Sequence, residues 1–155
     1  MEAIQNGIES VVISESVTAI CDRAFEYCRW IKSFQISRSV VSIGDEAFAK
    51  CTGLESITVL ESVEVIGSCA FCGCRISSIK IPMSIRSFKG NPFAKCGTLE
   101  EIDISENSNF VFVDGVLMDR EMTQAIYCNP SKEGDYSIPD TATTVCEFAF
   151  GSAKT

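Results

Sequence analysis

Hydrophobic and polar positions recur along this chain with a period of about 23 residues. The stretch 54–73, LESITVLESVEVIGSCAFCG, shows the repeating unit most completely. A period in the twenties is typical of a solenoid, in which each short unit buries its apolar face only against its neighbours. The first apolar column has spacings of 23, 23, 22 and 23 residues and consists of Ile8, Ile31, Leu54, Ile76 and Leu99.

Each unit contains three segments with different spacing. The first has the form L-x-x-I-x-I, and its β-branched residues at alternate positions predict one short parallel strand in every copy. The second is an apolar pair three residues apart, such as Val40 and Ile43, which predicts a short extended or 3₁₀ piece on the other face. The third, Ala-Phe-x-x-Cys, predicts a single helical turn with Phe and Cys directed inward. The predicted fold class is therefore an α/β-type repeat solenoid.

The period is interrupted between residues 106 and 133. Apolar runs at 110–113, 116–118 and 125–127, separated by Asp114-Gly115 and a polar turn, predict a β-hairpin insertion. The pattern resumes in a partial repeat at 136–155. We therefore predict one domain over residues 1–155, with repeats that start near residues 8, 31, 54, 76 and 99.

Composition and charge exclude some partners and compartments. A net charge of −8 and a pI near 4.5 disfavour nucleic acid and anionic membrane surfaces, and no apolar run approaches the roughly 20 residues that cross a bilayer. The N-terminus lacks the basic and apolar regions of a secretory signal, so we expect an intracellular protein or a fragment.

The chain has nine cysteines, an odd number, and most of them occupy fixed places in the repeat. This placement favours reduced thiols over a disulfide framework. Equivalent Cα atoms in stacked coils lie about 4.8 Å apart, which permits disulfides, but the parallel side chains do not suit the torsion of the bond. We therefore expect one inward column to remain buried and free: Cys28, Cys51, Cys74 and Cys96.

Candidate catalytic and metal-binding groups are few. The chain has no histidine, which removes Ser-His and Cys-His nucleophiles and imidazole metal ligands. The motif Cys69-x-x-Cys72-x-Cys74 resembles part of a zinc site, but Cys74 belongs to the inward column, so structural thiols are the favoured interpretation. The acidic pairs 45–46 and 100–101 diverge on a strand or corner and indicate a solvated surface. We expect no cofactor, no metal and no catalytic residue.

The outward side of the predicted strand ribbon is the candidate binding surface, because solenoids use stacked rows of exposed residues to hold partners. An ordinary solvated strand face explains the row equally well, since it lacks an aromatic anchor. Trp30, at a corner, is a separate exposed aromatic candidate. The candidate binding residues are Val12, Gln35, Thr58, Lys80 and Asp103 in the row, Lys32 and Glu55 beside it, and Trp30.

The segment SVVSIGDEAFAKCTGLESITV (39–59) resembles the BspA-like surface-antigen class of leucine-rich repeat, whose unit is similar to I-P-x-S-V-x-x-I-G-x-x-A-F-x-x-C-x-x-L-x-x-I-x. The insertion is similar to a D-G-V-L hairpin followed by I-P-D, here at 114–117 and 138–140. The resemblance implies a right-handed leucine-rich-repeat superhelix, a place on the cell surface or in secreted proteins, adhesion or protein binding, and no catalytic residues. The chain departs from the pattern in missing prolines, extra cysteines and the absence of an export signal.

The leading hypothesis from the sequence is a non-enzymatic interaction or adhesion module that binds a protein, or alternatively a glycan, through the solenoid surface. The alternative is a segment of an enzyme or larger surface protein with a site at the hairpin insertion, 110–127. That alternative requires a concave pocket beside the insertion, lined by at least two convergent titratable groups. The chain could also be one segment of a longer adhesin.

Overall fold

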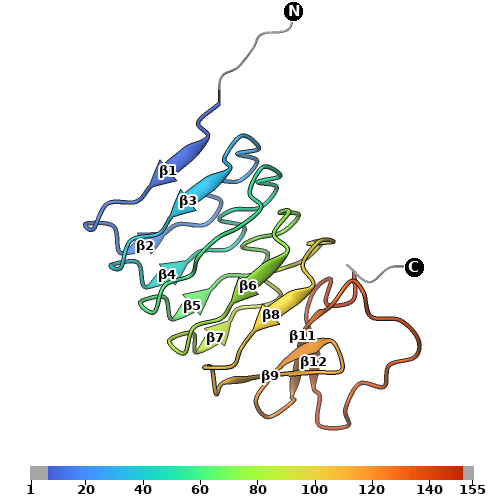
Figure 1. Ribbon diagram of the computed structural model, residues 1–155. Coiled ribbons are helices and arrows are strands. Elements are labelled where there is room, and N and C mark those ends of the chain that lie inside the picture. The colour runs from blue at the N-terminus through green and yellow to red at the C-terminus, as the bar shows by residue number, and fades with distance from the viewer. Residues whose placement is uncertain (1–6, 152–155) are drawn as a thin grey trace, which may run out of the picture.

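The computed structural model describes residues 7–151 as a stack of coils that runs from the N-terminal to the C-terminal end (Figure 1). All of the regular elements in this part of the chain are strands. The predicted repeat solenoid is therefore correct in its period and its parallel strands, but the molecule is a β-solenoid and not an α/β fold. The first five coils are the repeats that start near residues 8, 31, 54, 76 and 99, and the partial repeat at 136–155 is the sixth coil. The coils have two faces that carry strands, which we call the first and second faces.

The first face carries the strands predicted from L-x-x-I-x-I. They pair in parallel as β1 with β3 and as β6 with β8, with Val11 opposite Phe34 and Ile79 opposite Ile102. Ser33 also donates a hydrogen bond to the Ser10 hydroxyl at 2.9 Å, so a side-chain contact links these two strands as well. The strands are β1 (Ser10–Val12), β3 (Ser33–Gln35), β6 (Ser78–Lys80) and β8 (Glu101–Asp103).

The third coil interrupts this first face, so the prediction of a strand in every copy is wrong there. Residues 54–60 form no strand, and the backbone of residues 55–59 makes no hydrogen bond to either neighbouring coil in the described structure. Ile57 and Val59 are nevertheless buried. On this face, the third coil is thus held in the stack by its side chains and not by a strand ladder.

The second face is continuous. Its two-residue strands form one parallel sheet in the order β2-β4-β5-β7, and equivalent residues such as Ile20, Ile43 and Ile66 lie opposite one another. The extended piece predicted from the second apolar pair is therefore a strand. The strands are β2 (Ala19–Ile20), β4 (Ser42–Ile43), β5 (Val65–Ile66) and β7 (Ser87–Phe88).

The Ala-Phe-x-x-Cys segments are turns, so the predicted helical turns are wrong. In the first three coils, the residue before Ala and the residue before Cys both have positive φ, as Glu46 (55°) and Lys50 (62°) do in the second coil, and an α-helix does not tolerate this conformation. The backbone instead bonds to the next coil, for example from Phe48 N–H to the Ala70 carbonyl at 2.7 Å. The turns are thus stabilised along the stack as well as by hydrogen bonds within each turn, such as Ala49 N–H to the Glu46 carbonyl at 3.0 Å.

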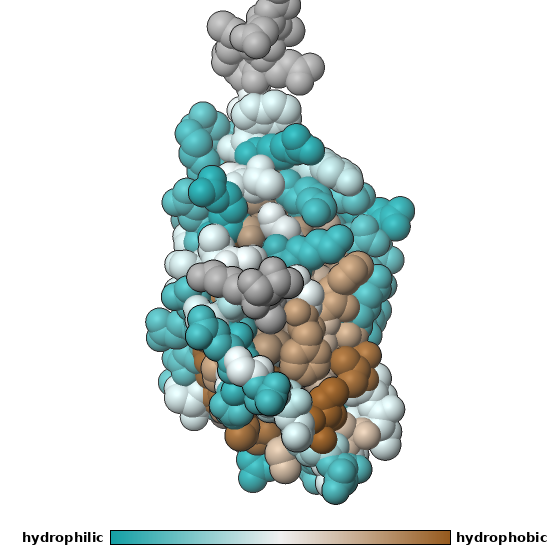
Figure 2. All heavy atoms as spheres, turned by 90° about the vertical axis from the view of Figure 1, so that its right-hand side faces the viewer, coloured by the Kyte–Doolittle hydropathy of each residue, from teal (hydrophilic) through white to brown (hydrophobic). Residues whose placement is uncertain are grey.

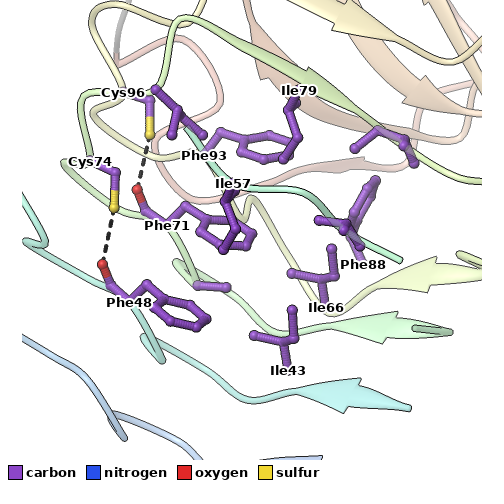
Figure 3. Packing of buried hydrophobic residues seen from close by; sticks show 14 of the residues in the cluster. Ile43, Phe48, Ile57, Ile66, Phe71, Cys74, Ile79, Phe88, Phe93 and Cys96 are labelled. Atoms are coloured by element: carbon purple, nitrogen blue, oxygen red, sulfur yellow. Dashed lines mark hydrogen bonds between the residues drawn. The ribbon is translucent and has the colours of Figure 1, made fainter. Parts of the chain in front are cut away.

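A column of aromatic rings fills the core between the two faces (Figure 3). Phe25, Phe48, Phe71 and Phe93 stack with ring centroids 5.5, 5.6 and 6.1 Å apart, and Tyr127 continues the column edge-on to Phe93 at 5.7 Å. The Phe and Cys side chains of these turns point inward, as predicted. Cys28 is the exception to full burial in its column, because it lies in the terminal coil and is half-buried.

The insertion is a β-hairpin with a third strand, in agreement with the sequence pattern. The sheet order is β12-β11-β10-β9, with antiparallel β9–β10–β11 and parallel β11–β12, so the third strand returns the chain to the solenoid. The strands are β9 (Phe110–Val113), β10 (Val116–Asp119), β11 (Gln124–Cys128) and β12 (Thr144–Val145). Of the partial repeat at 136–155, residues 152–155 lie outside the described part.

The fifth coil lacks the Ala-Phe-x-x-Cys turn. Strand β11 takes its place, and Tyr127 of β11 packs on Phe93 in the ring column. Buried Asn91 of the fourth coil spans the space that this leaves: its amide donates to the carbonyls of Glu147 and Phe148 in the sixth coil at 3.2 and 3.1 Å. Its side-chain oxygen accepts the Phe93 N–H at 3.0 Å. Asn91 therefore replaces the missing layer of backbone hydrogen bonds.

Candidate interaction surface

The first face presents the predicted row of side chains to solvent. Gln35, Thr58 and Lys80 are exposed, and Val12 is 69% exposed although it is apolar. Asp103 is half-buried. The inside–outside assignment of the strands is correct because alternate residues of each strand point to opposite faces, and Phe34, Ile79 and Ile102 point into the core.

Ion pairs between charged residues lie within the row and beside it. Lys32 lies 3.2 Å from Glu9, and Lys80 lies 2.9 Å from Glu106, whose carboxylate raises the pKa of Lys80. Hydrogen bonds from Ser105 lower the pKa of Asp103. Exposed pairs of this kind contribute little to stability, so the charges remain available to a partner.

A polar groove of about 310 Å³ opens where the third coil interrupts the first face. Its walls bring together two of the predicted binding residues, Lys32 and Glu55, and add Arg75. Arg75 is exposed and has no ion-pair partner among residues 7–151. The complete lining is Lys32, Thr52, Gly53, Glu55, Ser56 and Arg75.

The sequence analysis missed Arg75 as a candidate binding residue, although a signal was present. Arg75 alone separates Cys74 from Ile76, where other coils have two residues, and this shortened corner marks a surface turn. The corner places a free guanidinium at the groove. The spacing of 22 residues in the sequence marks this corner but does not by itself indicate a function.

The structure separates Trp30 from the row. Trp30 lies over Gly7, at which an added Cβ would come 2.4 Å from the indole ring, and its side chain is 49% exposed. It lines an apolar groove of about 370 Å³ at the N-terminal end of the stack. Trp30 therefore belongs to the end of the solenoid and not to the first face.

The thiols do not form a metal centre in the described structure. No group of three His, Cys, Asp or Glu side chains in residues 7–151 is arranged to hold an ion. Cys74 donates its S–H to the Phe48 carbonyl, and Cys72 packs with Ala49 and Ala94 in a small apolar cluster. Burial and the nearby Cys72 raise the pKa of Cys69. These thiols therefore pack as small apolar groups.

Comparison with known proteins identifies the repeat. The profile of the BspA-type leucine-rich repeat region matches residues 18–114 in six copies. The chain belongs to the BspA-type leucine-rich repeat family. A search of curated proteins finds no match.

Solved structures of other leucine-rich repeat proteins resemble the chain. A leucine-rich repeat protein from Eubacterium ventriosum is 27% identical with a TM-score of 0.71, over 92% of this chain and 45% of that one. One from Bacteroides ovatus is 33% identical with a TM-score of 0.58, over 62% of this chain and 25% of that one. A leucine-rich cell surface protein from Faecalibacterium prausnitzii, 21% identical with a TM-score of 0.60 over 95% of this chain and 53% of that one, shares the fold. The chain spans less than half of the first two proteins.

A small pocket of about 240 Å³ lies at the hairpin insertion, and its lining includes Asp114 and Lys132. The Lys132 ammonium and the Asp114 carboxylate form an ion pair with each other at 2.7 Å, so they are not directed together at a position that a substrate could occupy. Ser131 donates to the Glu100 carboxylate at 3.0 Å, and Asn129 donates to the Glu100 carbonyl at 2.6 Å. The polar groups of the pocket therefore fasten the insertion to the fifth coil.

In residues 7–151, the structure contains no helix long and apolar enough to cross a membrane.

Proposed function

We propose that this leucine-rich repeat chain is a non-enzymatic interaction module that binds a protein through the first face, with the third-coil groove at the centre of the contact. The observation that carries the proposal is the unpaired guanidinium of Arg75 beside Lys32 in an open groove. Although the chain as a whole has a net charge of −8, two cations, Lys32 and Arg75, line this groove with one carboxylate, that of Glu55. This local excess of cations favours a partner that presents a carboxylate, which arginine binds through two parallel hydrogen bonds.

The exposed row extends this contact along the solenoid axis. Gln35 and Thr58 lie on the coils that border the groove, and their side chains do not contribute to the core. Thr52 and Ser56 supply hydroxyl groups in the groove wall. The surface thus combines charge with several polar groups that hydrogen-bond a partner without any rearrangement of the backbone.

A matched pair of charge reversals tests the proposal. Arg75→Glu reverses the charge in the groove, whereas Arg38→Glu reverses an exposed arginine of the second coil that lies outside the groove and also has no ion-pair partner among the described residues. The immobilised full chain and both variants are incubated with a cell extract, and captured proteins are quantified by mass spectrometry. We expect a partner that wild type and Arg38→Glu retain and that Arg75→Glu loses at least tenfold.

Equal retention by all three proteins, or equal loss in both variants, contradicts a contact centred on the groove. A captured partner whose binding survives protease treatment and disappears after glycosidase treatment contradicts the assignment to a protein ligand. Circular dichroism of each variant shows whether the fold is intact.

The hairpin pocket is the alternative site, and its charged pair gives a direct test. An Asp114→Asn, Lys132→Met double variant removes both charges without adding bulk. If the pocket fastens the insertion, this variant changes stability but leaves capture of the partner unchanged. Loss of capture with an intact fold would show that the partner binds at the insertion and not at the groove.

A further inference from the structure

The turn of the third coil carries a pair of cysteines that the repeat does not require. Cys69 precedes Ala70-Phe71 and Cys72 follows it, and no other coil has a cysteine at either position. In the second and fourth coils, Ala49 and Ala94 occupy the position of Cys72 and are buried as it is. Alanine therefore satisfies the packing at this position, and the thiol there is an addition to the repeat.

The backbone of this turn brings the two thiols together. The Cys72 N–H donates to the Cys69 carbonyl at 2.9 Å. A turn closed in this way holds its first and fourth Cα atoms within about 7 Å, and a disulfide spans roughly 4.4–6.8 Å. Both side chains pack in one small apolar cluster with Ala49 and Ala94, whereas Phe71 between them belongs to the main core. The two cysteines therefore lie on the same side of the turn.

A pocket of about 220 Å³, which we call the turn pocket, is lined by both thiols. Cys69 is half-buried and Cys72 is buried, so a small molecule in the pocket reaches Cys69 first. The turn pocket shares no lining residue with the third-coil groove. It is therefore a site distinct from the proposed interaction surface.

Charged side chains of other coils also line the turn pocket. Glu26, Glu46 and Glu147 supply three carboxylates, and Lys50 supplies one ammonium group. Arg23 offsets part of this charge, since it lies 3.1 Å from Glu46, but Glu147 has no ion-pair partner among residues 7–151. Figure 2 shows the side of the molecule on which the turns lie, and most of its upper half is hydrophilic. The excess of carboxylates favours a cationic molecule in the pocket.

We propose that Cys69 and Cys72 form a dithiol site that exchanges with a small cationic disulfide. The Cys69 thiolate attacks one sulfur of the small disulfide, which releases one thiol and leaves a mixed disulfide on Cys69. The Cys72 thiolate then attacks the sulfur of Cys69, which closes a disulfide between the two cysteines and releases the second thiol. The two cysteines together lose two electrons and two protons, which the small disulfide takes up as it becomes two thiols.

The surroundings of the pair determine how this exchange depends on conditions. A bond between Cys69 and Cys72 closes a loop of only four residues, so it adds little to stability and is readily reduced again. Burial, followed by the nearby Cys72, raises the pKa of Cys69, and Glu147 and Glu46 act in the same direction. Little thiolate is therefore present at pH 7, and the first attack should accelerate as the pH rises toward this pKa.

Two variants at the pair separate the steps of the exchange. Reduced full-length wild type, Cys69→Ser and Cys72→Ala are incubated with cystamine, a small disulfide with two ammonium groups, and the remaining thiols are then alkylated. Cys21→Ser, which removes an exposed thiol in another turn, is the control. Chymotrypsin cleaves the denatured, unreduced protein after Phe71 and separates the two cysteines unless a disulfide joins them. Mass spectrometry identifies the linked fragments, and circular dichroism checks each fold.

We expect a disulfide between Cys69 and Cys72 in wild type and in Cys21→Ser, formed about tenfold faster at pH 8 than at pH 7. Cys72→Ala should stop at the mixed disulfide on Cys69, because the second thiol is absent. Cys69→Ser should keep Cys72 as a free thiol, because Cys72 is buried. Dithiodipropionate, a disulfide of similar size with two carboxylates, should react several-fold more slowly than cystamine.

The proposal is overturned if both thiols of native wild type stay free, or if Cys69 keeps the mixed disulfide and never bonds to Cys72. A disulfide from either cysteine to Cys74 or Cys96 also overturns it, because the turn would then not set the pairing. Equal rates with cystamine and dithiodipropionate contradict the preference for a cationic disulfide.

Discussion

The thiol of Cys74 donates a hydrogen bond to the carbonyl of Phe48, in the preceding coil, with a sulfur–oxygen distance of 3.0 Å (Figure 3). Cys51 and Cys96 make the same contact with Phe25 and Phe71, also at 3.0 Å. Cysteine suits this column because it packs as a small apolar side chain and still has a weak donor for a buried carbonyl. The cysteines therefore join neighbouring coils without any covalent bond.

The first prediction concerns the reactivity of these thiols. Cys51, Cys74 and Cys96 are buried and should react with an alkylating reagent only when the protein opens, whereas exposed Cys21 should react at once. Half-buried Cys28 should be intermediate. Peptide mass spectrometry after timed alkylation of native and denatured protein gives the rates. Disulfides between successive members of the column would contradict this account.

The second prediction is a loss of stability at alkaline pH. Burial raises the pKa of Cys96 to about 12, from 9.0 for a free thiol. Above pH 9 the unfolded chain therefore releases this proton and the folded chain retains it, so the free energy of unfolding falls as the pH rises. One thiol contributes up to about 1.4 kcal/mol per pH unit in this range.

Urea denaturation between pH 8 and pH 10.5 measures this effect, with Cys96→Ala as the control. The alanine variant is less stable at neutral pH, but its stability should fall less steeply above pH 9. Parallel slopes for wild type and variant would show that Cys96 ionises alike in the folded and unfolded chains.

The third prediction concerns two glycines at different kinds of turn. Gly67 lies where an added Cβ would come 2.4 Å from the backbone nitrogen of Asp45, whereas a Cβ on Gly97 would meet nothing within 4 Å. Gly67→Ala must push two coils apart and should cost about 1–3 kcal/mol. Gly97→Ala should be neutral or stabilising by up to about 1 kcal/mol. Thermal melts rank the two, and equal effects would contradict the close stacking at this corner.

Much of the fold follows from the sequence because the same positions of each coil must be apolar to fill the core. Phe48 and Val63 of the interior coils are fully buried as the period predicts, since a polar side chain at either position would need a hydrogen-bond partner inside the core. The turns could not be predicted, because spacing alone does not distinguish a helical turn from one with positive φ at Glu46 and Lys50. These positions carry ordinary residues rather than glycine, so they give no local signal.

The candidate site was only partly predictable for a similar reason. Exposure of Gln35 and Thr58 follows from strand alternation. The groove at Arg75 depends on an interruption in strand pairing, which is a property of three adjacent coils and not of any one of them. The bridging role of Asn91 was hidden in the same way, because it depends on the missing turn of the fifth coil.

The central claim is that the core carries the fold and the first face is free for a partner. Guanidinium denaturation of Phe48→Ala and Thr58→Ala tests it most directly. Phe48 is fully buried between the rings of Phe25 and Phe71, so its loss should lower the free energy of unfolding by about 3–5 kcal/mol. Thr58 is exposed, and its replacement should change that free energy by no more than about 0.5 kcal/mol in either direction. A larger loss from Thr58→Ala than from Phe48→Ala would contradict the inside–outside assignment on which the proposed binding surface rests.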